Sequence, residues 1–309
     1  MLYILLFGLL AASFLLGMTW MRIGLFNLSG GAMESNLRKM TGTPLKGMLT
    51  GIAMTVVLQS SSAVTVIAVG LVSARILSFP QTVGIILGTN IGTTVTLEFL
   101  AFDLSALIIP LLVIGALLLL FRKARVRSWG FILLGIGIIF ASMEGFGRLA
   151  RPLESVGYVQ EMLLMMKEQP LAALGLGVVL TALIQSSTVM TGIAMSFIGA
   201  GALSLETGIA IMLGANIGTC ATALLAGIGA GAEARLVAYS HMWLNVGGAL
   251  LFYPFMPMLA DWSGAMGGDP DSQLAHASVL YNIACSAIVL PFAVQFGSWI
   301  VRLHGRKIS

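Results

Sequence analysis

The sequence predicts an all-α, polytopic membrane protein with an internal duplication. Hydrophobic residues make up 58% of the 309 residues and charged residues 9%, against about 25% charged residues in an ordinary soluble domain. Apolar runs as long as a membrane-spanning helix recur along the chain. Two further apolar stretches, interrupted by polar residues, repeat each other. A surplus of four positive charges is too small for a nucleic-acid-binding face.

Five uninterrupted apolar runs are predicted to cross the bilayer. They cover residues 2–20, 104–121, 130–144, 236–259 and 274–301. The first run has no basic residue before its apolar core, so we interpret it as a retained helix and not as a signal peptide. Between the runs, residues 151–167 interleave Met and Leu with charges, which favours an amphipathic helix at the membrane surface. The acidic residues, the three His and the two Cys are scattered, which predicts no disulfide and no transition-metal site.

The duplication relates residues 51–96 to residues 177–222. A shift of 126 positions aligns the two segments without a gap and gives 19 identities in 46 positions. The identities concentrate in two motifs: QSSS at 59–62 on QSST at 185–188, and GTNIGTTVT at 88–96 on GANIGTCAT at 214–222. The predicted copies are residues 1–125 and 127–260, followed by an extra helix at about 273–303, all in one transport domain without a soluble regulatory domain.

The distribution of Lys and Arg favours inverted repeats. If each QS-rich segment is a re-entrant helical hairpin with the motif at its tip, one side of the membrane receives 13 basic residues and the other receives 3. Two full crossings would give 11 and 5. Basic residues collect in the cytoplasmic loops of membrane proteins. The hairpin interpretation therefore predicts an inner-membrane protein with its N-terminus outside the cell membrane and its C-terminus in the cytoplasm. The 13 are Arg22, Arg38, Lys39, Lys46, Arg75, Arg122, Lys123, Arg125, Arg127, Arg235, Arg302, Arg306 and Lys307.

Inverted repeats with interrupted helices are typical of secondary transporters, which bind substrate and ions where the repeats meet. Hairpin tips at QSS, and helix breaks predicted around Asn90 and Asn216, would free backbone groups and hydroxyls at that point. Helix N-termini attract anions, and freed oxygens attract Na⁺. Neither repeated segment carries a basic residue near its motifs, because the only one, Arg75, falls in a predicted loop. We therefore expect dipoles, hydroxyls and co-bound cations to meet an anion's charge without an Arg clamp. A tetrahedral oxyanion suits such a cage.

The doubled QSS motif, each copy followed by G-x-N-I-G-T, resembles the bacterial sodium/phosphate cotransporter family, which is related to the animal type II sodium-phosphate cotransporters. The resemblance implies Na⁺-driven uptake of inorganic phosphate, no enzymatic activity, no cofactor beyond the coupling ion, and dimers. This sequence departs from the pattern in three ways. Only LHGRKIS follows the last predicted helix, Thr188 replaces the Ser of the first copy, and Cys220 replaces Thr94.

The candidate site residues follow from the two motifs and this resemblance. For phosphate they are Ser60, Ser61, Ser62, Ser186, Ser187, Thr188, Asn90 and Asn216. For Na⁺ they are Gln59, Gln185, Asn90, Thr93, Thr94, Asn216 and Thr219. The same residue types also serve as close-packing and interhelical hydrogen-bonding groups in membrane helices. The roles of Glu98, Glu144, Asn282 and His241 with Asn245 stay open between ion binding and structure.

Two other functions compete with phosphate transport. One is transport of another small anion, such as arsenate, sulfate or a carboxylate, by the same architecture. The other is an intramembrane serine hydrolase, which conflicts with the lack of a Lys or His base in either repeat core.

Overall fold

The computed structural model describes residues 1–29 and 42–305. Within these ranges the chain is helical and has no β-strand. Arg38, Lys39, Arg306 and Lys307, which contribute to the predicted charge asymmetry, lie outside the described residues.

Six helical segments in the described part are long and apolar enough to cross a membrane. They are Leu2–Ser29, Phe79–Leu100, Ala124–Glu154, Leu205–Gly227, Ala232–Ala265 and Pro270–His304. Four of the five predicted crossings lie within these segments, whereas the run 104–121 falls on a shorter apolar helical segment, Ser105–Leu119. The chain is therefore a multi-pass helical protein, as its composition predicts.

The helices of the first half are α1 (Leu2–Ser29), α3 (Pro44–Leu58), α4 (Ser61–Ser73), α5 (Phe79–Leu100) and α6 (Ile108–Leu119). Those of the second half are α7 (Ala124–Glu154), α8 (Gly157–Glu168), α9 (Pro170–Ile184), α10 (Ser187–Gly199), α11 (Leu205–Gly218), α12 (Cys220–Gly227) and α13 (Ala232–Phe252). The chain ends with α14 (Met256–Ala265), α15 (Pro270–Val289) and α16 (Ala293–His304). Short 3₁₀ turns precede α6, α14 and α16.

The sequence repeat recurs in the boundaries of the helices. The bounds of α3 and α4 are 44–58 and 61–73, and those of α9 and α10 are 170–184 and 187–199, a shift of 126 residues at all four ends. The starts of α5 and α11, at 79 and 205, differ by the same amount. The relative orientation of the two halves in the membrane stays a prediction.

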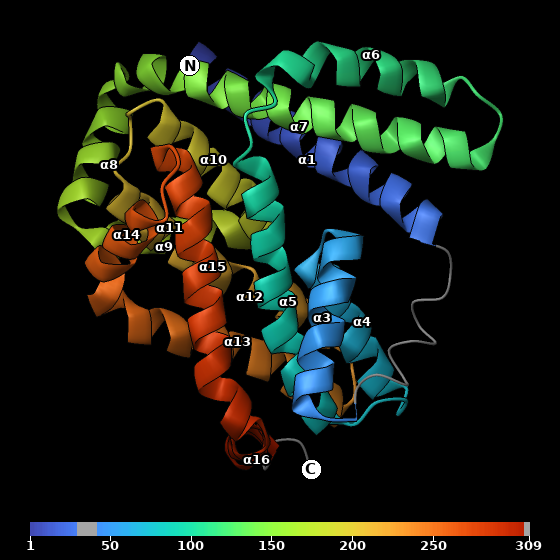
Figure 1. Cartoon of the computed structure of the whole chain (residues 1–309). Helices are drawn as coiled ribbons and strands as arrows, with labels where there is room; N and C mark the ends of the chain where they lie inside the picture. The colour runs from blue at the N-terminus through green and yellow to red at the C-terminus, as the bar shows by residue number, and fades with distance from the viewer. Residues whose placement is uncertain (30–41, 306–309) are drawn as a thin grey trace.

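Glycine residues let α3 and α5, and likewise α9 and α11, lie in backbone contact. A Cβ atom on Gly88 of α5 would lie 2.0 Å from the carbonyl oxygen of Met48 on α3. A Cβ on Gly214 of α11 would lie at the same 2.0 Å from the carbonyl oxygen of Leu174 on α9. Close approach of small residues is how membrane helices gain packing energy without a hydrophobic driving force. Figure 1 shows α3 lying alongside α5.

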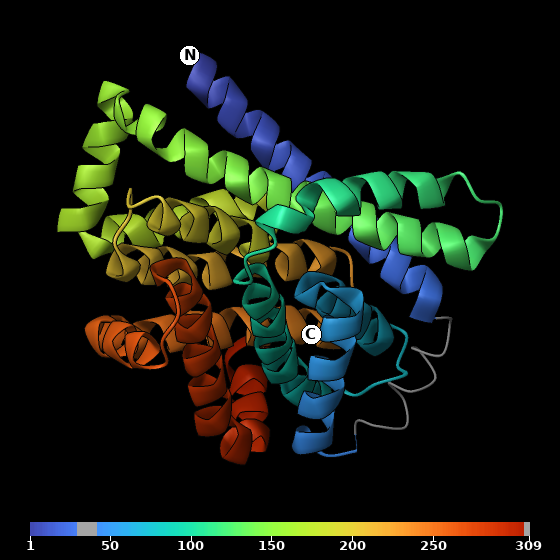
Figure 2. The same ribbon diagram turned by 45° about the horizontal axis from the view of Figure 1, so that its top comes forward.

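Helices α1 and α7, which precede the two aligned segments, also pack against each other. In Figures 1 and 2, α1 runs along α7, and α6 lies along another face of α7. A Cβ on Gly17 of α1 would lie 2.8 Å from the carbonyl oxygen of Gly135 on α7. Two hydrophobic cores result: a large one that includes residues of α1, α7, α10 and α11, and a smaller one that includes residues of α4, α5 and α13.

The predicted break around Asn90 is wrong, because α5 is continuous from Phe79 to Leu100. The threonines around Asn90 bond within the helix: Thr93 donates to the carbonyl of Thr89, and Thr94 to that of Ile91. The motif's glycines face α3, so they allow close packing and do not break the helix. The second repeat is interrupted at Thr219, three residues beyond Asn216, and Thr219 keeps helical backbone angles.

The first helix is longer than predicted, because α1 continues to Ser29. Arg22 therefore lies inside a helix and not in the cytoplasmic loop where the charge count placed it. The surface helix predicted at 151–167 is divided: its first residues complete α7, and the rest forms α8. The chain bends by 118° between α8 and α9.

Candidate functional site

Each QS motif forms a two-residue turn between two short helices. Gln59 and Gln185 adopt left-handed backbone angles, with φ of 51° and 58°. The next residue, Ser60 or Ser186, is extended, and its side chain accepts a hydrogen bond from the backbone N–H of Ala63 or Val189. A left-handed residue ends a helix, and an extended Ser begins one, so the motif turns the chain at this point.

The turn leaves hydroxyl groups at the start of the second helix. Ser61 and Ser62 open α4, and Ser187 and Thr188 open α10. Among the residues described, the structure gives their hydroxyls no intramolecular hydrogen bond. The first backbone N–H groups of a helix also lack an intrahelical partner and carry the positive end of the helix dipole. Both turns therefore offer hydrogen-bond donors to an anion.

The two turns differ in exposure. Ser61 and Ser62 are half-buried, whereas Ser187 and Thr188 are 7% and 6% exposed. The same contrast extends along the helices, because α10 is buried from Ser187 to Ile198 while α4 buries one stripe: Val64, Thr65, Ala68, Val69 and Val72. The structure thus covers the start of α10 more completely than the start of α4.

The side chain of Gln59 is held by neighbours on two sides. Its Oε1 accepts a hydrogen bond from Thr96 Oγ1 of α5 at 2.8 Å, and its Nε2 donates to the carbonyl of Val56. In the second repeat Thr222 takes the place of Thr96, but its hydroxyl is buried without a partner, and Gln185 is exposed. The sequence comparison aligns Thr96 with Thr222 but does not identify either as a site residue.

Arg22 of α1 reaches the first turn from outside the aligned segment 51–96. Its Nε donates to the backbone carbonyl of Gln59 at 2.8 Å. The expectation that no Arg lies near the motifs is therefore wrong for the first turn, because a side chain 37 residues upstream supplies the positive charge. A guanidinium has five donors, so this bond leaves others for a bound anion.

The Asn residues of the two N-I-G motifs are half-buried and have different neighbours. Asn90 Nδ2 donates to Asn245 Oδ1 of α13 at 3.1 Å, and Asn245 in turn donates to Cys220 Sγ of the second repeat. Asn90 also lines a cavity of about 190 Å³ between α5, α13 and α15. Asn216 contacts the sulfur of Met212 instead. A polar chain through α13 thus connects the two motifs.

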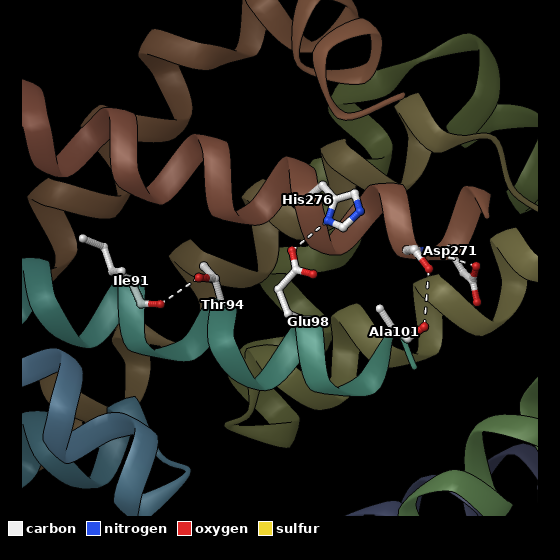
Figure 3. A network of polar contacts seen from close by, with 7 residues as sticks. Ile91, Thr94, Glu98, Ala101, Asp271 and His276 are labelled. Carbon is white, nitrogen blue, oxygen red and sulfur yellow. Dashed lines mark hydrogen bonds and ion pairs between the residues drawn. The ribbon is translucent and has the colours of Figure 1, made fainter. Parts of the chain in front are cut away.

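Several predicted ion ligands already use their hydroxyl protons. Thr93, Thr94 and Thr219 donate to carbonyls one turn earlier in their own helices. Their oxygens keep lone pairs, but these contacts give them a helix-stabilising role. Figure 3 shows the bond from Thr94 to the carbonyl of Ile91.

The acidic candidates pair with basic side chains. Glu98 Oε1 lies 2.8 Å from His276 Nδ1 of α15, and both side chains are partly exposed (Figure 3). Glu144 pairs with Arg148 one turn along α7. His276 lies 178 residues from Glu98, and no sequence pattern indicates this pair. His241 is buried, and its Nδ1 has no partner among the described residues.

The second helix of each QS pair packs on the other repeat. Helix α4 contacts α12 and α13, and α10 contacts α5, α7 and α15. Gly192 of α10, for example, faces Phe14 and Leu100. Helix α10 therefore touches α5, which holds the first N-I-G-T motif, and α4 touches α12, which begins directly after the second N-I-G-T motif.

Comparison with known proteins finds relatives over most of the chain. A protein of Bacillus subtilis, the uncharacterized protein YqeW, is 39% identical over 296 residues, which is 96% of both chains. The putative inorganic phosphate export protein YjbB of Escherichia coli is 27% identical over 285 residues, 91% of this chain and 52% of that protein. The sodium-dependent phosphate transport protein 2A of rat is 31% identical over 134 residues, 41% of this chain and 21% of that protein.

The chain thus spans about half the length of the YjbB protein. No solved structure matches it. The model of the Na⁺/Pi-cotransporter family matches residues 13–148 and 155–266, a range that includes both QS turns and both N-I-G-T helices. The chain therefore belongs to the Na⁺/Pi-cotransporter family.

Proposed function

We propose that the protein is a secondary transporter that couples the uptake of inorganic phosphate to Na⁺ by alternating access. The observation that carries the proposal is the pair of QS turns, each of which presents free hydroxyls and helix N-terminal N–H groups. Membership of the Na⁺/Pi-cotransporter family supports phosphate as the substrate. The mammalian relative is named for sodium-dependent transport.

Phosphate binding follows from the donors at the two turns. A phosphate oxygen at the start of α4 would accept bonds from Ser61 or Ser62 and from the exposed N–H groups. Arg22 adds a positive charge beside the first turn. The start of α10 offers Ser187 and Thr188 but no such Arg among the described contacts, so the two turns are chemically unequal.

Movement between two states follows from the same turns. Helices α3 and α4 have 15 and 13 residues, about 20 Å each, which is shorter than the roughly 30 Å hydrocarbon core. We propose that each pair is re-entrant and that the repeats are inverted in the inner membrane, with the N-terminus outside. The unequal burial of α4 and α10 then represents one of two states, with the first turn more accessible.

The direction of transport needs its own test, because the YjbB relatives are named for phosphate export. Purified protein in proteoliposomes should take up labelled phosphate under an inward Na⁺ gradient and not under a K⁺ or pH gradient alone. A reversed Na⁺ gradient should drive efflux through the same protein. Phosphate flux that does not depend on the Na⁺ gradient in either direction would contradict the proposal.

Selectivity separates phosphate from other anions. Arsenate, sulfate and small carboxylates should be added in turn to the uptake assay. Competition by sulfate or a carboxylate at phosphate-like concentrations would favour the broader anion transporter.

Na⁺ and phosphate should strengthen each other's binding. Thermodynamic linkage requires that the factor by which Na⁺ raises phosphate affinity equals the factor by which phosphate raises Na⁺ affinity. Calorimetric titration of phosphate in Na⁺ and then in choline measures this factor. Equal phosphate affinity in the two salts would refute coupling at a shared site.

A further inference from the structure

Helix α8 covers an apolar cavity that α10 lines from another side. The cavity has a volume of about 160 Å³, and the residues that line it are all apolar. Those from α8 recur with the spacing of one helix face, and they are Val159, Met162, Leu163 and Met166. Those from α10 include Ile193 and Ala194. Figures 1 and 2 show α8 at the edge of the molecule, so the cavity lies near the outer surface of the helical bundle.

A cavity of this size and lining suits an apolar guest. A cavity of about 150 Å³ lined by Leu, Ile and Phe stays dry and binds small apolar molecules. The unbranched side chains of Met162 and Met166 adapt to a guest that is itself flexible. In a membrane, the abundant flexible apolar group is the acyl chain of a lipid.

A polar cavity adjoins the apolar one. Its volume is about 480 Å³, and Leu163 and Leu203 line both cavities. Its other lining residues include Glu154 at the end of α7 and Lys167 at the end of α8. An apolar cavity beside a polar one matches a molecule that has an apolar tail and a polar head.

The two charges in the polar cavity indicate which head group fits. Within residues 1–29 and 42–305, neither Glu154 nor Lys167 has an ion-pair partner, and they do not pair with each other. A head group with a primary amine and a phosphate would meet both, because the ammonium donates to the carboxylate and the phosphate accepts from the lysine. An anionic head group would leave Glu154 unpaired, and a quaternary ammonium has no N–H to donate. The charges therefore favour phosphatidylethanolamine over other phospholipids.

The position of α8 agrees with a lipid at the membrane surface. The chain bends by 118° between the charged helix α8 and the apolar helix α9. The sequence predicts α8 as part of a helix that lies along the surface. With α8 in that position, a head group beside Lys167 lies at the level of the surrounding head groups, and its acyl chain reaches inward under α8.

We propose that the two adjoining cavities bind one phosphatidylethanolamine molecule, with an acyl chain between α8 and α10 and the head group between Glu154 and Lys167. The chain packs against α10, the helix that begins at Ser187 and presents the second QS turn. The inference does not depend on the proposed transport activity, because it concerns the binding of a lipid to the folded protein.

Native mass spectrometry of the purified protein tests the head-group site. Dioleoyl phosphatidylethanolamine should bind more tightly than dioleoyl phosphatidylglycerol or dioleoyl phosphatidylcholine. Lys167→Gln should weaken its binding by roughly two- to tenfold. Arg151→Gln is the matched control, since Arg151 is an exposed basic residue that lines neither cavity, and it should leave binding unchanged. Glu154→Gln should remove the preference for phosphatidylethanolamine over phosphatidylglycerol, because only the phosphate then finds a charged partner.

Ala194→Leu tests the acyl-chain site, because the larger side chain occupies the apolar cavity. It should weaken the binding of phosphatidylethanolamine. Ala68→Leu is the repeat-related control: Ala68 and Ala194 are both 1% exposed, but Ala68 does not line this cavity. It should bind the lipid as the wild type does. Equal binding of the three lipids by the wild type, or equal weakening by Lys167→Gln and Arg151→Gln, would overturn the inference. Unchanged binding in Ala194→Leu would also overturn it.

Discussion

The close contact between α3 and α5 predicts that a single methyl group at Gly88 destabilises the protein. In Gly88→Ala the new Cβ would lie 2.0 Å from the carbonyl oxygen of Met48 and 2.8 Å from its carbonyl carbon. Ordinary contact begins near 3.4 Å, so the two backbones must separate by roughly 1.4 Å. Overpacking of this kind costs about 1–3 kcal/mol, which exceeds the gain of up to about 1 kcal/mol from replacing Gly by Ala in a helix.

The separation should also affect transport, because α5 holds Gln59 through Thr96. Gly70 of α4 is the matched control, since a Cβ there meets nothing within 4 Å. Thermal unfolding in detergent should show a lower melting temperature for Gly88→Ala and an equal or higher one for Gly70→Ala. The repeat-related Gly214→Ala should behave like Gly88→Ala. A Gly88→Ala protein as stable as Gly70→Ala would refute the packing argument.

Three further predictions concern the substrate site, the orientation and an interhelical pair. Ser61→Ala and Ser187→Ala should each weaken phosphate binding by roughly 10- to 150-fold in calorimetric titrations, since a hydrogen bond to a charged group contributes about 1.5–3 kcal/mol; unchanged affinity in both would assign these serines to packing. A single Cys at position Asp269 should react with an impermeant thiol reagent added outside intact cells, and labelling only after permeabilisation would reverse the proposed orientation. Glu98→Gln and His276→Ala should each lower stability, and the double variant should be no less stable than the worse single variant, because the two side chains share one contact; additive losses would mean that they act independently.

Local sequence patterns predicted much of the architecture. Four of the five uninterrupted apolar runs located helical segments long enough to cross a membrane, and the 126-residue shift predicted that the two halves share helix boundaries. The QS motifs were placed correctly at turns between short helices, because a left-handed Gln and an N-capping Ser are local features.

The contacts between distant residues could not be predicted in this way. The bond from Arg22 to Gln59 depends on how α1 packs, and the pair of Glu98 and His276 joins residues 178 positions apart. The break predicted around Asn90 failed for a different reason. Gly and Thr in a membrane helix look the same in sequence whether they interrupt the helix or serve its packing, and here Gly88 faces another backbone while Thr93 bonds to its own helix.

The glycine contacts limit which parts of this protein can move relative to one another. Where two backbones touch at Gly51 and Gly88, neither helix can rotate or slide without meeting the other's carbonyls. Helices α3 and α5 should therefore travel as one block, and α9 and α11 as another. Under the proposed alternating access, we therefore expect α4 and α10 to turn against these blocks at the left-handed residues Gln59 and Gln185, which would make two candidate site residues the hinges of the movement.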